Sequence, residues 1–137
     1  MFEGKIIIAS GPVIVEDGKL LVNKDSKDDF YKIPGGTIEE GIESLEDACI
    51  REVKEEINGE IRIVRALTPM IIWKNPTTKE KMAIVLIHFE AELLNRKEVR
   101  ASGETVEVSW LDISEIKNGM HNVSPNIKFL IEKGDIK

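Results

Sequence analysis

The segment from Gly35 to Gly59 constrains the fold of this chain most, because it places a double-glycine turn in front of an acidic helix. The helix boundaries follow from local signals. Ser44 is a favourable N-cap, and Asn58 tolerates the left-handed conformation in which many helices end. The sequence therefore predicts a helix over Leu45–Ile57.

Acidic and apolar residues lie side by side on this predicted helix. At about 100° per residue, one side of it is apolar, and that side consists of Leu45, Cys49, Val53 and Ile57. Glu52, Glu55 and Glu56 are neighbours at i, i+3 and i+4, where like charges cost an isolated helix about 0.2–0.5 kcal/mol per pair. Glu56 lies at the edge of the apolar side, where an unpartnered carboxylate would have a raised pKa. A bound divalent cation would satisfy all three acids, whereas the alternative is an ordinary solvated helix face.

The loop before the helix favours the metal site over the solvated face. Pro34-Gly35-Gly36 ends a short strand-like run, Phe30–Ile33, and forms a turn. Its backbone can approach a ligand closely because glycine has no Cβ. A double-glycine turn followed by a capped acidic helix is typical of a site that holds a divalent metal ion against a pyrophosphate.

Residues 36–59 resemble a Nudix box, whose family pattern is G-x5-E-x7-R-E-U-x-E-E-x-G-U, with U an aliphatic residue. From Glu43 the match is close, since seven residues separate it from Arg51-Glu52-Val53-Lys54-Glu55-Glu56. There are two departures. Six residues, Thr37–Ile42, stand between Gly36 and Glu43, with Ile42 the simplest insertion. The closing glycine is one place late, with Asn58 in its slot, and asparagine still permits the helix to end there.

The resemblance implies the Nudix fold, an α/β/α sandwich with a mixed β-sheet in the α/β class. A length of 137 residues and 42% hydrophobic content suit a single domain over residues 1–137. Asp17-Gly18 predicts a hairpin, and Asn75-Pro76-Thr77-Thr78 predicts a turn. The predicted strands are Ile6–Val15, Leu20–Asn23, Ile61–Trp73, Met82–Leu93 and Val106–Leu111, with a helical turn over Asp112–Asn118 and a last helix starting at Ser124-Pro125.

The activity that the resemblance implies is metal-dependent hydrolysis of the pyrophosphate bond in a nucleoside diphosphate linked to another group. The substrate would be a nucleoside triphosphate, ADP-ribose or a dinucleotide. By the same resemblance, Mg²⁺ or Mn²⁺ is held by Glu52, Glu55, Glu56 and the Gly36 carbonyl. Arg51 and Glu43 orient these ligands, and Arg51 and Glu55 are counted among the catalytic residues.

The general base is expected outside the box. Some family members use a glutamate in a loop far downstream, and Glu104 in Ser102-Gly103-Glu104 is the predicted catalytic residue, with Glu107 behind it. Glu104 as an ordinary loop acid is the alternative.

Substrate-binding residues are predicted beside the glycine turn, at Tyr31, Lys32 and Gly35. Tyr31 and Trp73 have the rings to stack on a base, although a core position is favoured for both. The ammonium groups of Lys32, Lys74, Lys79 and Lys81 carry the charge to meet phosphates, and the alternative is that they are ordinary surface lysines.

Charge and composition limit the kinds of partner and the location expected for this chain. A net charge of −6 argues against binding nucleic acid or an anionic membrane, but it permits a small nucleotide substrate. No apolar run approaches the 18 residues of a membrane span, and Met1–Lys5 is not a secretory signal. The single cysteine, Cys49, is expected in the core of a cytoplasmic protein that is a monomer or homodimer.

Two other functions remain open. A non-catalytic Nudix-like sensor would bind a nucleotide without cleaving it, and degenerate box acids would favour it, but these acids are intact. An isomerase resembling the isopentenyl diphosphate isomerases would need a catalytic cysteine in a cleft, and Cys49 on the apolar helix side is poorly placed for that role.

Overall fold

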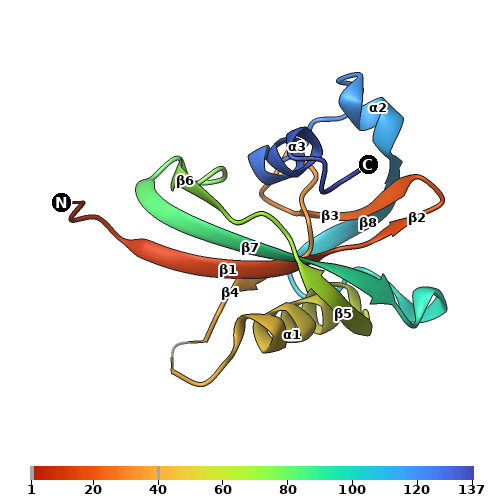
Figure 1. Ribbon diagram of the computed structural model, residues 1–137, viewed down its shortest axis with the longest axis horizontal. Helices are drawn as coiled ribbons and strands as arrows, with labels where there is room; N and C mark the ends of the chain where they lie inside the picture. The colour runs from red at the N-terminus through yellow and green to blue at the C-terminus, as the bar shows by residue number, and fades with distance from the viewer. Residues whose placement is uncertain (1, 40) are drawn as a thin grey trace.

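The computed structural model describes residues 2–39 and 41–137 and contains two sheets (Figure 1). The larger has five strands and is mixed, because its two long strands run parallel and the remaining pairs are antiparallel. Its strands are β4 (Gly36–Thr37), β1 (Ile6–Val13), β7 (Lys81–Leu93) and β5 (Ile61–Ala66), with β6 (Met70–Lys74) also paired to β7. The smaller sheet is antiparallel, in the order β2 (Val15–Glu16), β3 (Lys19–Asp25), β8 (Thr105–Asp112).

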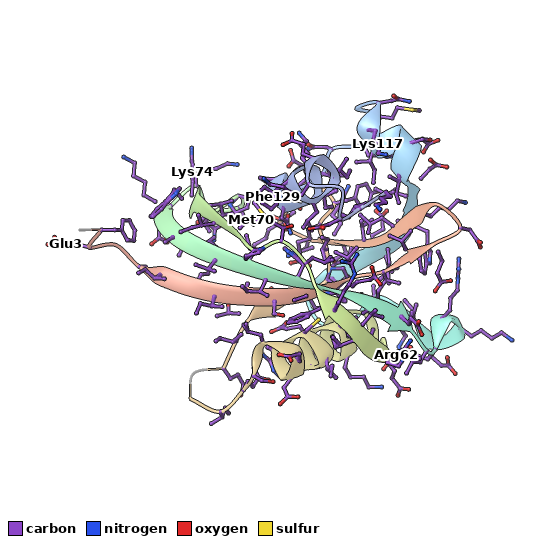
Figure 2. All side chains as sticks on the ribbon, in the orientation of Figure 1. Glu3, Arg62, Met70, Lys74, Lys117 and Phe129 are labelled. Atoms are coloured by element: carbon purple, nitrogen blue, oxygen red, sulfur yellow. The ribbon has the colours of Figure 1, made fainter. Side chains whose placement is uncertain are left out.

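Helices cover the strands on both sides, which confirms the predicted α/β/α sandwich. Helix α1 (Leu45–Ile57) lies on one side, and α2 (Ile113–Lys117) and α3 (Pro125–Glu132) lie on the other, while a short 3₁₀ helix, η1 (Arg96–Glu98), follows β7 (Figure 1). Side chains fill the spaces on either side of the strands as two apolar clusters (Figure 2). No helix within the described ranges has the length and hydropathy needed to cross a bilayer.

Helix α1 has the predicted boundaries. The Ser44 hydroxyl accepts a hydrogen bond from the Asp47 N–H at 3.1 Å, and Asn58 ends the helix at φ 56°. Cys49, Val53 and Ile57 are buried against the strands. The Ser10 hydroxyl donates to the Leu45 carbonyl at 3.0 Å, which ties the first turn of α1 to β1 and fixes the position of the acidic face.

Three predicted strands are wrong in extent. The first divides after Val13, because Val13 packs in the cluster under α3 and Ile14 in the cluster under α1, so the chain passes from one sheet to the other. The strand predicted over Ile61–Trp73 divides because the Thr68 N–H bonds the Asp135 carboxylate and Pro69 has no N–H to donate. Phe30–Ile33 forms only isolated bridges.

Candidate active site

Glu56 occupies the partly buried edge of α1 that its helical position predicts. One carboxylate oxygen accepts the Gly35 N–H at 3.0 Å, and the other accepts the Asn23 side-chain N–H at 3.2 Å. Burial raises the pKa of Glu56 to about 7, although the Gly35 hydrogen bond and the Lys32 charge act in the opposite direction. The glycine turn and the acidic helix are therefore joined directly through this carboxylate.

Asn23 is a site residue that the motif does not reveal. It is fully buried in β3, and its amide nitrogen lies between Glu56 and the Thr105 hydroxyl, 3.1 Å away. Its sequence signal is a polar residue directly after the apolar run Leu20–Val22, whose three residues are buried. Asn23 and Gly35 thus each bind one oxygen of the Glu56 carboxylate.

Arg51 connects the remaining acids of the helix. Its guanidinium binds Glu43 through two hydrogen bonds, from Nε at 2.6 Å and Nη2 at 3.0 Å, which lower the pKa of Glu43. Its Nη1 donates to Glu52 at 2.9 Å and to Glu55 at 3.2 Å. Arg51 also donates to the Thr37 carbonyl at 3.1 Å. Arg51 therefore contacts both the helix acids and the loop before them, as its expected orienting role requires.

Close approach explains why both turn residues are glycines. A Cβ on Gly35 would lie 2.4 Å from the Ser10 carbonyl oxygen, and a Cβ on Gly36 would lie 2.7 Å from the Glu52 carboxylate. The Glu52 side chain is only 15% exposed, and its pKa is raised chiefly by this burial, with Arg51 acting in the opposite direction. The inserted residue does not disturb this contact, because Ile42 is 76% exposed in the loop beyond β4.

One pocket of about 290 Å³ gathers most of the predicted site residues. The loop that carries Glu104 is attached to the end of α1, since the Ser102 N–H donates to the Glu56 carbonyl at 2.9 Å. The predicted residues lining the pocket are Lys32, Gly35, Glu52, Glu55, Glu56 and Glu104. Residues separated by half of the chain thus meet at one opening.

The three helix carboxylates in this pocket bind protein partners. Within residues 2–39 and 41–137, no three His, Cys, Asp or Glu side chains converge as a ready-formed metal group. Glu52 and Glu55 point to Arg51, and Glu56 to Asn23 and Gly35. Oxygen ligands of the kind that Mg²⁺ and Mn²⁺ prefer are present, but side-chain rotation has to bring them together.

Tyr31 and Glu107 lie together outside this pocket. The Tyr31 hydroxyl donates to Glu107 at 2.6 Å, and Lys24 Nζ lies 4.3 Å from the centre of the Tyr31 ring. Glu107 also accepts from Ser109 at 2.6 Å, and these two hydrogen bonds lower its pKa. Neither Tyr31 nor Glu107 lines the pocket that contains Glu104.

A core position was predicted for both Trp73 and Cys49, and only Cys49 occupies one. Trp73 is 55% exposed and packs edge-on against Phe2 with ring centres 5.3 Å apart, so the favoured core position is wrong for it. Cys49 is fully buried, as predicted, and burial raises the pKa of its thiol to about 12. A thiol this basic stays protonated at neutral pH and does not act as a nucleophile.

The raised pKa of Glu56 predicts a pH dependence of stability. The folded state binds this proton more tightly than the unfolded chain, whose carboxyl has the ordinary value of 4.5. Protonation of Glu56 therefore stabilises the folded state fully below pH 4.5, and this contribution is lost as the pH rises through about 7. At about 1.36 kcal/mol per pKa unit, it amounts to about 3 kcal/mol at most.

Urea denaturation with chelator at pH 5 and pH 8 measures this effect. The variant Glu56→Gln does not lose this contribution. The free energy of unfolding of the variant minus that of the unchanged protein should therefore be larger at pH 8 than at pH 5. An equal difference at both pH values would contradict the assignment of the raised pKa to Glu56.

Known proteins with similar sequences include an archaeal and a bacterial relative. The chain is 28% identical over 112 residues to an ADP-ribose pyrophosphatase of Methanocaldococcus jannaschii, covering 80% of this chain and 63% of the relative. It is 32% identical over 117 residues to a MutT-like protein of Streptomyces ambofaciens, covering 85% and 70%. The chain thus spans less than two thirds of the length of the first relative.

Solved structures show the same fold. The MutT protein from Methanosarcina mazei superposes with a TM-score of 0.76 at 23% identity, covering 98% of this chain and 96% of that one. A bifunctional NMN adenylyltransferase/ADP ribose pyrophosphatase from Francisella tularensis, complexed with AMP and a manganese ion, superposes with a TM-score of 0.67 at 18% identity, covering 95% and 42%. The family model of the NUDIX domain matches residues 6–130, so the chain belongs to the Nudix family.

Proposed function

We propose that this protein is a metal-dependent Nudix-type pyrophosphohydrolase that cleaves the pyrophosphate bond of a nucleoside diphosphate linked to another group. The observation that carries the proposal is the single pocket lined by Glu52, Glu55 and Glu56 from α1 and by Glu104 from the loop before β8. Family membership and the similarity to the ADP-ribose pyrophosphatase of Methanocaldococcus jannaschii support the same reaction.

The donor set fits a hard divalent cation, Mg²⁺ or Mn²⁺. Three carboxylates of one helix line the pocket, and the Gly36 backbone lies so close to Glu52 that a Cβ would clash with its carboxylate. Glu56, whose burial raises its pKa, gains a charge partner if a cation binds. When bound, the cation neutralises phosphate charge and activates a water molecule. We assign Glu52, Glu55, Glu56 and the Gly36 carbonyl as its ligands.

Other residues of the chain orient and complete this site. Arg51 and Glu43 hold Glu52, Glu55 and the loop before α1 in place through the hydrogen bonds described above. We assign Glu104 as the group that accepts the proton of the attacking water, because it is the exposed carboxylate that the loop before β8 adds to the pocket.

Lys32 and Gly35 complete the substrate side of the pocket. Both line it, and the Lys32 ammonium there meets the negative charge of the substrate phosphates. Tyr31 lies outside the pocket, and we give it no part in this proposal.

The identity of the substrate is tested with a panel of nucleotides that includes ADP-ribose, nucleoside triphosphates and dinucleoside polyphosphates. Purified protein should release nucleoside monophosphate or phosphate from at least one of them when Mg²⁺ or Mn²⁺ is present. Removal of the cation by excess chelator should abolish turnover, because the carboxylates alone repel a pyrophosphate. Chromatography of the products measures both results.

Two results would contradict this function. Full activity in excess chelator would remove the cation from the mechanism. Tight binding of a nucleotide without cleavage under every cation tested would favour the sensor alternative. The buried, protonated Cys49 disfavours isomerase chemistry of the cysteine-dependent kind.

A further inference from the structure

The loop between β7 and β8, which carries Glu104, is bound along the C-terminal end of α1. Three successive carbonyls at this end, those of residues 56, 57 and 58, each accept a hydrogen bond from the loop. The donors, in that order, are the Ser102 N–H at 2.9 Å, the Arg100 N–H at 3.0 Å and the Asn95 side-chain N–H at 2.9 Å. Because the last carbonyls of a helix have no partner inside it, the loop supplies the hydrogen bonds that α1 needs there.

Asn58 also binds the loop with its side chain. The Asn58 amide donates to the Glu98 carbonyl at 3.1 Å, and the Asn95 side-chain oxygen accepts the Glu60 N–H at 2.7 Å. Asn58 has φ 56°, in the left-handed region, and it stands where the Nudix pattern has a glycine. Glycine would end the helix equally well, but it has no side chain to bind the loop. The asparagine pair, Asn58 and Asn95, therefore joins the loop to the helix end in both directions.

Glu104 lies in a turn at the far end of this loop. The Thr105 N–H closes the turn by donating to the Ser102 carbonyl at 3.0 Å. Ser102 binds the main chain of Glu56, and the Thr105 hydroxyl accepts from Asn23, which also binds the Glu56 carboxylate. Both ends of the turn are thus tied to Glu56, which is assigned to the metal site.

The position of the Glu104 carboxylate depends on the backbone of this turn. Glu104 is exposed, and Gly103 before it has no side chain to pack. A general base has to lie within hydrogen-bond reach of the water that it deprotonates. A misplacement of about 1 Å can lower a rate roughly hundredfold. The hydrogen bonds between the loop and α1 therefore bear directly on catalysis.

We propose that Asn58 and Asn95 are positioning residues, which hold the loop so that Glu104 faces the carboxylates of α1. The inference rests on the proposed function, since it concerns the base of the same reaction. Neither asparagine lines the acidic pocket, so both act through Glu104 rather than on the substrate. The asparagine in the glycine slot of the motif is then a part of the catalytic design of this chain.

The first test is kinetic. Asn58→Gly should lower kcat about tenfold with KM and the Mg²⁺ dependence unchanged, a loss below that of a full 1 Å misplacement because Arg100 and Ser102 still bind the helix end. Asn95→Asp should act in the same direction, because it keeps the acceptor for the Glu60 N–H and loses the donor to Asn58. Asn118→Gly, the same substitution at the exposed asparagine that ends α2, is the matched control and should have normal kcat.

A double-mutant comparison separates positioning from a general structural effect. In a Glu104→Gln background, Asn58→Gly should lower kcat by less than about twofold, because the group through which it acts is already absent. An equal loss in both backgrounds would overturn the proposal. Unchanged kcat in both Asn58→Gly and Asn95→Asp would overturn it as well.

Hydrogen exchange distinguishes failure here from failure of the proposed function. The Arg100 and Ser102 amides should exchange faster in Asn58→Gly, while amides inside α1 keep their protection. Unchanged exchange at both amides would overturn the proposal even in an enzyme that cleaves nucleotides. Absence of cleavage by the unchanged protein would refute the proposed activity, and exchange would still measure whether Asn58 holds the loop.

Discussion

Replacing Glu56 with glutamine is expected to lower kcat by about three orders of magnitude or more while the fold is kept. Removing a charged metal ligand takes away several kcal/mol of transition-state stabilisation, and each 1.36 kcal/mol is about tenfold in rate. Glutamine retains the shape and an oxygen that can accept the Gly35 N–H, which Glu56 binds at 3.0 Å. Steady-state kinetics with saturating Mg²⁺ and circular dichroism measure the two parts of this expectation.

Stability separates a ligand role from a structural role for Glu56. Without metal, Glu56→Gln should be as stable as the unchanged protein or more stable, because a partly buried carboxylate near Glu52 is made neutral. Glu46→Gln, at an exposed acid in the first turn of the same helix, is the control and should keep normal activity. Unfolding of Glu56→Gln would make Glu56 structural and would remove it from the proposed metal site.

Glu104→Gln should lower kcat by about two to four orders of magnitude, the span typical of losing a general base. Its loop has Gly103 at φ 59°, a conformation suited to glycine, and its carboxylate lines the pocket with the three helix acids. Because Glu104 is proposed to act on water rather than on the cation, the dependence of the rate on Mg²⁺ concentration should change little. The measurement is kcat across a Mg²⁺ titration.

Glu107→Gln is the matched control for this prediction. Glu107 lies three residues away but accepts hydrogen bonds from Tyr31 and Ser109 outside the acidic pocket, so its loss should affect kcat far less. A near-normal Glu104→Gln enzyme would remove Glu104 from the mechanism. A large loss in Glu107→Gln alone would transfer the role to Glu107.

Short-range signals made α1 predictable. Its cap residues Ser44 and Asn58, and the apolar spacing between them, act within a few turns of the helix, so the boundaries are those expected. The division of Ile61–Trp73 into β5 and β6 was not predictable in this way. It depends on Asp135, which is distant in sequence and binds the backbone at Thr68. Propensity alone favours one continuous strand there.

The same distinction holds in the candidate site. Arg51, Glu52 and Glu55 lie on one helix, and Glu43 lies just before it, so their spacing can be read from the sequence. In the structure Arg51 contacts Glu43, Glu52 and Glu55 as expected. Asn23 was missed because its contact with Glu56 joins a strand to a helix that is distant in the sequence. Exposure of Trp73 was missed because hydrophobicity predicts burial only where a neighbouring element covers the side chain.

The parallel pairing of β1 with β7 has a consequence for folding kinetics. Ile6 pairs with Ala83 and Val13 with Glu90, while Lys19 of β3 pairs with Asp112 of β8. Neither sheet can be completed until late in synthesis. Closing such long loops costs chain entropy before the strand pairs that stabilise the sheet can form. We therefore expect this chain to fold slowly for its size, with the unpaired, apolar β1 exposed to aggregation on a nascent chain until β7 leaves the ribosome.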